Sequence, residues 1–213
     1  MGNSEENIAL ADINKKSLPI FTETKSYTDW VYDLINPYLK GMILELGSGN
    51  GLISSIFISH EIPIYLSDPS KSNLEALRIR FKDSTAVKAI SYIDYIKPDF
   101  YQCYSKLEAG LDTIIALNFY AQDLLHQHAI EKARFLLRKR GHLIFLLPAY
   151  TTLYDPTEQN VDDLKKYNSS ALRRLLSDNF KILKYRYFNY ISLNPSENSK
   201  EIGLSVLAIV RKL

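Results

Sequence analysis

Hydrophobic residues recur along the chain with two alternating spacings. Short apolar runs bounded by turn residues predict buried strands, and apolar residues spaced three or four positions apart predict helices. The strands predicted in this way span residues 42–44, 62–66, 86–90, 111–118, 142–147, 182–193 and 204–210. The predicted helices span residues 27–36, 52–59, 73–81, 124–138 and 171–177, the fourth of them running into a basic cluster at 138–140 that suits the negative end of a helix dipole.

Strands and helices alternate through most of the chain, which predicts a largely parallel sheet covered by helices on both faces. The last two predicted strands have no long helix between them, so they can pair antiparallel. We therefore expect a doubly wound α/β fold with a seven-stranded, mostly parallel, Rossmann-like sheet and an antiparallel C-terminal strand. Residues 1–20 are polar and poor in aromatic residues, which predicts a weakly ordered segment before a single domain at 21–213.

Composition narrows the class of protein. The 213 residues are 46% hydrophobic and carry a net charge of +2, with acidic and basic residues intermixed, which argues against a strongly basic nucleic-acid module. Cys103 is the single cysteine, so an intrachain disulfide and a cysteine-rich zinc site are excluded and no metal is expected. Without a recognisable signal segment or a long apolar span, the chain is expected to be a soluble cytoplasmic protein that does not bind membranes.

Three of the eight glycines fall within five positions, directly after the first predicted strand. The segment reads Glu45-Leu-Gly-Ser-Gly-Asn-Gly51. Glycine allows positive φ and lets a ligand approach the backbone, and ligands of open α/β sheets bind at such turns. The alternative is a tight turn that binds no ligand, but three alternating glycines are more than such a turn needs.

The spacing of these glycines and the lack of positive charge around them restrict the ligand. The third glycine is one position too early for the G-x-G-x-x-G dinucleotide pattern, and no Lys-Ser or Lys-Thr pair follows as in a P-loop. No lysine or arginine occurs in residues 43–60, whereas Glu45 is acidic. The turn is therefore predicted to bind a nucleoside without phosphates that carries a cationic group.

An acid ends the second predicted strand. The carboxylate of Asp68 has two acceptor oxygens, which suit the two hydroxyls of a ribose. Pro69 then restricts the backbone and offers an apolar edge to a flat base. The alternative is that Asp68 only caps the helix that follows.

These motifs resemble those of class I S-adenosylmethionine-dependent methyltransferases. The segment from Glu45 to Gly51 matches the family's acid-x-Gly-x-Gly-x-Gly motif, and Asp68 matches the acid after its second strand. The likeness covers the chain from Tyr27 onward and is closest to a bacterial branch that methylates small molecules, in which a Tyr-x-x-Trp helix precedes the first strand, as Tyr27 and Trp30 do here.

The resemblance implies S-adenosylmethionine as cofactor and S-adenosylhomocysteine as product. It implies that the methionine part lies along the glycines near Glu45, the ribose on Asp68, the methyl group near Asn118, and the base near residues 91–94, with Tyr27 closing the pocket. The residues expected to bind the cofactor are Tyr27, Glu45, Gly47, Ser48, Gly49, Gly51, Asp68, Pro69 and Asn118.

The expected reaction is methyl transfer to an oxygen or nitrogen of a small-molecule acceptor. The related branch continues its fourth strand with Glu-His where this chain has Ala121 and Gln122, so no catalytic residue is assigned.

A non-catalytic, cofactor-binding protein with a regulatory or scaffolding role is the alternative. A nicotinamide or flavin protein is disfavoured by the glycine spacing, and nucleic acid is not an expected substrate because no Asn-Pro-Pro-Tyr-type segment follows the fourth strand. The acceptor and the oligomeric state stay open.

Overall fold

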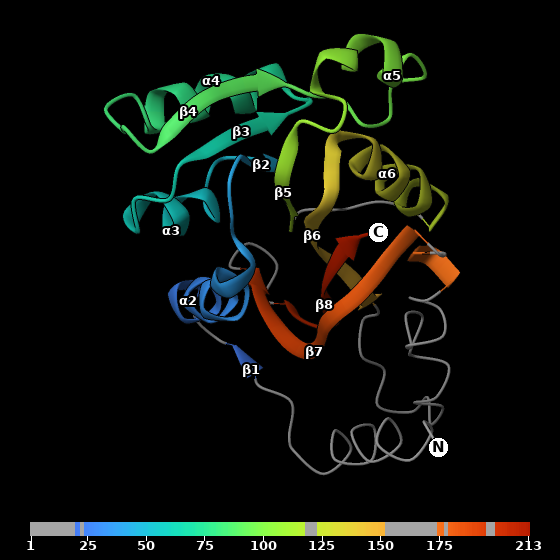
Figure 1. Cartoon of the computed structure of the whole chain (residues 1–213). Coiled ribbons are helices and arrows are strands. Elements are labelled where there is room, and N and C mark those ends of the chain that lie inside the picture. The colour runs from blue at the N-terminus through green and yellow to red at the C-terminus, as the bar shows by residue number, and fades with distance from the viewer. Residues whose placement is uncertain (1–19, 22–23, 118–122, 152–173, 177–178, 195–198) are drawn as a thin grey trace.

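The computed structural model describes residues 20–21, 24–117, 123–151, 174–176, 179–194 and 199–213 (Figure 1). Eight strands form one sheet in the order β1-β7-β8-β6-β5-β2-β3-β4. Their bounds are β1 Ile20–Phe21, β2 Ile43–Leu46, β3 Ile64–Asp68, β4 Val87–Tyr92, β5 Leu111–Ala116, β6 Leu137–Thr151, β7 Phe180–Asn194 and β8 Ser199–Lys212.

The directions of the strands confirm the predicted fold class. Strands β4, β3, β2, β5 and β6 are joined by parallel pairings, whereas β8 runs antiparallel to both β6 and β7. The seven predicted strands are all present, and the two-residue β1 adds a short parallel pairing with β7 that the hydrophobic pattern did not predict. Because β2 and β3 are parallel neighbours, the residues that follow each strand meet at one edge of the sheet.

Helices cover both faces of the sheet. Their bounds are α2 Thr24–Ile35, α3 Ser54–Ser59, α4 Lys71–Arg80, α5 Phe100–Cys103 and α6 Asp123–Leu136, with single 3-10 turns at Asn36–Tyr38 and Ser105–Leu107. Side chains of α2, α3 and α4 pack in one buried cluster, and those of α5 and α6 pack in another. The short α5 was not predicted, and residues 174–176, within the predicted helix 171–177, are helical.

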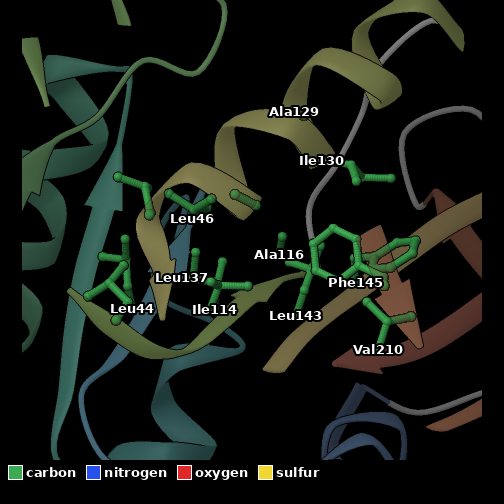
Figure 2. Packing of buried hydrophobic residues seen from close by; sticks show 14 of the residues in the cluster. Leu44, Leu46, Ile114, Ala116, Ala129, Ile130, Leu137, Leu143, Phe145 and Val210 are labelled. Carbon is green, nitrogen blue, oxygen red and sulfur yellow. The ribbon is translucent and has the colours of Figure 1, made fainter. Parts of the chain in front are cut away.

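Alternation along the strands explains why the fold has two cores. In β2, Ile43 joins the cluster of α2 and α3, whereas the adjacent Leu44 joins that of α6. Figure 2 shows the second cluster, in which side chains of α6 and of β2, β5 and β6 point toward one another. Phe145 and Leu136 in this cluster are fully buried, so this packing fixes α6 against the sheet.

The basic cluster at residues 138–140 follows the end of α6 and is not part of the helix, which corrects the predicted helix boundary. Helix α6 ends at Leu136, and Leu137 already pairs with Leu111 as the first residue of β6. The side chain of Arg138 instead lies 3.2 Å from the carboxylate of Asp112. Leu137 is fully buried, so core packing ends the helix earlier than its apolar spacing indicated.

Candidate functional site

The glycine turn joins β2 to α3 and is folded as the sequence predicts. Gly47, Gly49 and Gly51 have φ values of +69°, +56° and +80°, which glycine adopts without steric penalty. The N–H of Ser48 donates to the carbonyl of Ser67 in β3, and the N–H of Gly51 donates to the carbonyl of Ser48, both across 2.9 Å. The turn is thus fixed to the neighbouring strand through Ser48, which is buried.

Gly51 is required by packing as well as by φ. A Cβ at this position would lie 2.5 Å from a ring carbon of Phe81 and 2.9 Å from a methyl of Leu77. These two side chains come from the end of α4 and would have to move to admit any other residue. The third glycine therefore holds α4 close to the turn.

Asp68 connects the end of β3 to the glycine turn. Its Oδ2 accepts the N–H of Gly49 at 2.8 Å, and its Oδ1 accepts the N–H of Ser70 at 2.8 Å and the side-chain amide of Asn73 at 3.0 Å. The N-cap of α4 is Ser70, so capping alone does not account for Asp68. The residue is 4% exposed, and its Oδ2 is directed toward the turn.

Glu45 is a buried acid beneath the turn. It is 1% exposed and accepts a hydrogen bond from the hydroxyl of Ser54 at the start of α3. The pKa of Glu45 is raised to about 7, mainly by burial; the nearby charge of Asp68 adds to the rise, and hydrogen bonds from Ser54 and Ser48 oppose it. The ionisation of Glu45 therefore responds to any charge that enters the turn.

Residues 93–97, after β4, form the next part of the same edge. Asp94 is anchored there: its N–H donates to the hydroxyl of Tyr104 at 3.0 Å, and its Oδ1 accepts the N–H of Ile96 at 2.9 Å. Burial raises the pKa of the Tyr95 phenol, and the charges of Asp68 and Asp94 raise it further, which places Tyr95 in the field of Asp68. The sequence prediction reached this segment but did not single out Tyr95.

Arg80 approaches the glycine turn in space, although no lysine or arginine is close to the turn in sequence. Arg80, at the end of α4, donates to the carbonyl of Asn50 at 3.1 Å and to the hydroxyl of Ser55 at 2.9 Å. This contact joins residues 25 and 30 positions apart, so no local pattern predicts it. The guanidinium is exposed and bound to neutral oxygens of the turn and of α3.

The structure describes some of the other predicted site residues only in part. Pro69 follows Asp68 and is exposed. Tyr27 lies within α2, but its side chain is outside the described part of the chain, as is the whole of Asn118. In the described ranges, no group of three or more His, Cys, Asp or Glu side chains is arranged to hold a metal, and no helix is long and apolar enough to cross a membrane.

The comparisons with known proteins identify the architecture. No family model and no curated protein matches the chain. Among solved structures, an S-adenosylmethionine-dependent methyltransferase from Methanosarcina mazei superimposes with a TM-score of 0.60 at 16% identity, over 85% of this chain and 98% of that one. The N-methyltransferase NodS from Bradyrhizobium japonicum superimposes with a TM-score of 0.56 at 16% identity, over 88% and 95% of the two chains.

The same architecture also occurs in a protein named for a different reaction. The [4+2]-cyclase SpnF has a TM-score of 0.59 and 14% identity, with 86% of this chain and 80% of that chain covered. At these identities the comparisons define the fold and leave the reaction open. The chain has the fold of the class I S-adenosylmethionine-dependent methyltransferases.

Proposed function

We propose that the protein binds S-adenosylmethionine and transfers its methyl group to a small-molecule acceptor. The observation that carries this proposal is the contact between Asp68 and Gly49, which sets a buried carboxylate against a turn of three positive-φ glycines. This is the edge of an open α/β sheet where ligands bind.

The acceptor capacity of Asp68 fits a ribose. An ionised carboxylate has about four lone-pair positions, and the protein supplies three donors to Asp68. Two of these donors are backbone N–H groups that belong to the turn and to the start of α4. The third is the side-chain amide of Asn73, which can rotate, so it is the donor that a ribose hydroxyl would replace.

The environment of Glu45 fits a ligand with an ammonium group. Its carboxylate is almost fully buried and its hydrogen-bond partners are neutral hydroxyls. Across the described residues, no lysine, arginine or histidine forms an ion pair with it. A buried carboxylate without a protein cation favours a ligand that supplies the positive charge.

The chain's contribution to the reaction is mainly orientation. The sulfonium of S-adenosylmethionine supplies an already activated methyl group. The glycine turn and Asp68 then hold the two ends of the cofactor in a fixed direction, and such orientation is worth up to roughly 7–11 kcal/mol in favourable cases. A general base is needed only when the acceptor must lose a proton, so the absence of Glu-His at Ala121 and Gln122 is compatible with transfer.

Calorimetric titration with S-adenosylhomocysteine tests the binding step. We expect one site per chain with micromolar affinity, and no heat at millimolar ligand would refute the proposal. Binding should be followed by an assay with isotope-labelled S-adenosylmethionine and a panel of small amines, phenols, alcohols and carboxylates, in which label must move to at least one acceptor.

Cofactor binding without transfer is the second candidate function. It is supported by Ala121 and Gln122 in place of the acid and histidine, and by the occurrence of the fold in a protein named as a cyclase. Tight binding of S-adenosylhomocysteine with no labelled product over the whole acceptor panel would favour it.

A further inference from the structure

Lys132 is a buried lysine on α6 whose ammonium binds the backbone of a distant segment. Its Nζ donates to the carbonyl of Tyr95 at 2.5 Å and to that of Lys97 at 3.0 Å, and lies 5.2 Å from the centre of the Phe100 ring. Only 9% of the residue is exposed, which is rare for lysine. The side chain therefore joins α6 to the segment after β4.

Carbonyl oxygens, rather than a carboxylate, compensate the buried charge. In the part of the chain that the structure describes, Lys132 forms no ion pair, and Asp94 is the acid whose charge acts on it. Burial lowers the pKa of Lys132, and Asp94 partly offsets that effect. Because a buried ammonium without acceptors is strongly unfavourable, the carbonyls of Tyr95 and Lys97 are held where Lys132 requires them.

The segment that Lys132 holds is next to Asp68. Tyr92, the last residue of β4, pairs with Asp68 at the end of β3, and the phenol of Tyr95 lies within reach of the Asp68 charge. Residues 93–97 thus line the edge of the sheet on the far side of Asp68 from the glycine turn. With the ribose on Asp68, this is the side on which a base attached to that ribose would lie.

We propose that Lys132 is a positioning residue for the base end of the nucleoside. It acts through Tyr95 and Lys97, whose backbone it fixes, and it does not itself touch the ligand. This inference rests on the proposed binding of S-adenosylmethionine. It goes beyond that proposal because it makes recognition of the base depend on Lys132 of α6. This helix lies on the opposite face of the sheet from α3 and α4.

A second lysine of the chain provides a matched control. Lys212 also donates to two backbone carbonyls, those of Arg134 at 2.8 Å and Leu137 at 2.6 Å, and burial lowers its pKa as well. It is the last residue of β8 and contacts the start of β6, at the edge of the sheet opposite to Asp68. Lys132→Met and Lys212→Met therefore remove the same kind of interaction, the first between α6 and the segment after β4, and the second between β8 and the C-terminal end of α6.

The test measures the dissociation constants of S-adenosylhomocysteine and S-inosylhomocysteine, which differ only in the base. The wild-type chain must bind S-adenosylhomocysteine; if it does not, the proposed function fails. We expect Lys132→Met to weaken that binding by about tenfold or more, and Lys212→Met by less than about twofold. The preference for adenine over hypoxanthine should fall in Lys132→Met alone. Equal effects of the two substitutions, or an unchanged preference for adenine, would overturn the inference while leaving the proposed function intact.

A second variant and a second measurement cover the case in which Lys132→Met does not fold. Lys132→Arg keeps the charge and the donors, so it should bind S-adenosylhomocysteine within about threefold of the wild-type chain. In the wild-type chain, the ligand should slow hydrogen exchange at the amides of residues 94–97. Unchanged exchange in these residues on saturation with ligand would also overturn the inference.

Discussion

The backbone N–H of Gly49 donates to Oδ2 of Asp68 across 2.8 Å, between residues 19 positions apart. This bond joins the turn after β2 to the end of β3, so one carboxylate both shapes the turn and places a negative charge beside it. A charge-assisted hydrogen bond of this kind is stronger than one between neutral groups. The carboxylate should therefore matter for ligand binding and for the order of the turn.

We predict that Asp68→Ala weakens S-adenosylhomocysteine binding by about 100-fold or more, equivalent to about 3 kcal/mol. The substitution removes the acceptor proposed for the ribose and leaves the N–H of Gly49 without its partner. Calorimetric titration measures the loss. Asp83→Ala is the control, because Asp83 is an exposed acid that lies 3.8 Å from the ammonium of Lys82.

Asp68→Asn separates the two roles of the carboxylate. Its carbonyl oxygen can still accept one of the hydrogen bonds, but the charge is lost, so we expect an affinity between those of the wild-type chain and Asp68→Ala. If Asp68→Ala binds within about twofold of the wild-type chain, Asp68 does not hold the ligand and the site has been placed wrongly.

We predict that Gly51→Ala lowers the free energy of unfolding by about 2–4 kcal/mol. One part arises because alanine is strained at a φ of +80°, and the other because its Cβ would lie 2.5 Å from Phe81. Denaturant unfolding measures the sum. A loss below about 0.5 kcal/mol would contradict the described geometry.

The double variant Gly51→Ala/Phe81→Leu tests the packing part alone. Leucine lacks the distal ring atoms that the new Cβ would meet, while the φ strain and the contact with Leu77 at 2.9 Å remain. We therefore expect the double variant to lose less free energy of unfolding than the two single variants lose together. Strict additivity would show that the ring of Phe81 contributes nothing to the loss, which would then come from backbone strain and the contact with Leu77.

The sequence predicted the parts of the fold that depend on short-range patterns. Apolar runs located the seven main strands because each run lies within a few residues. The glycine spacing and Asp68, each directly at the end of its own strand, indicated the candidate site. Boundaries set by tertiary packing were missed. Leu137 has apolar spacing that continues α6, yet it is the first residue of β6, where it is fully buried.

Contacts between distant elements were not predictable from one sequence. Arg80 is 30 positions from Asn50, and Lys132 is 37 positions from Tyr95, yet both pairs are hydrogen-bonded. Each basic residue occurs in a helix with ordinary charged spacing, and its partner is a backbone carbonyl with no sequence signature. Only the arrangement of α4 and α6 around the sheet brings these groups together.

We predict that ionisation of Glu45 destabilises the ligand-free protein as pH rises. Its pKa is 4.5 in the absence of structure and about 7 in the fold, so the fold binds more protons than the unfolded chain between these values. The stabilising contribution of the protonated acid is complete below pH 4.5 and is lost as pH rises through about 7. The loss is about 3 kcal/mol.

Urea unfolding of the wild-type chain and Glu45→Gln at several pH values measures this effect. Glutamine does not ionise, so the stability of the variant relative to the wild-type chain should increase between pH 4.5 and 7. Ser54→Ala removes a hydrogen bond that lowers the pKa of Glu45, and should move the transition to higher pH. If the stability difference between Glu45→Gln and the wild-type chain does not change with pH, the pH dependence does not come from Glu45.

We predict that Arg140→Gly stabilises the protein by about 1 kcal/mol. Arg140 has a φ of +66°, which glycine adopts without the clash between Cβ and the backbone that an arginine suffers. Its carbonyl accepts a hydrogen bond from the ammonium of Lys40 at 3.1 Å, and this bond remains in Arg140→Gly because it uses a backbone oxygen. Thermal unfolding should show a higher midpoint for the variant.

Lys139→Gly is the matched control, because Arg140 has a positive φ and the adjacent Lys139 does not. Glycine at position 139 only adds freedom to the unfolded chain, so we expect a loss of about 0.5–1 kcal/mol where Arg140→Gly gives a gain. Substitutions that change stability in opposite directions at adjacent exposed positions would show that backbone strain at Arg140, rather than the loss of a positive charge, causes the effect. Two variants that shift stability in the same direction would refute this explanation.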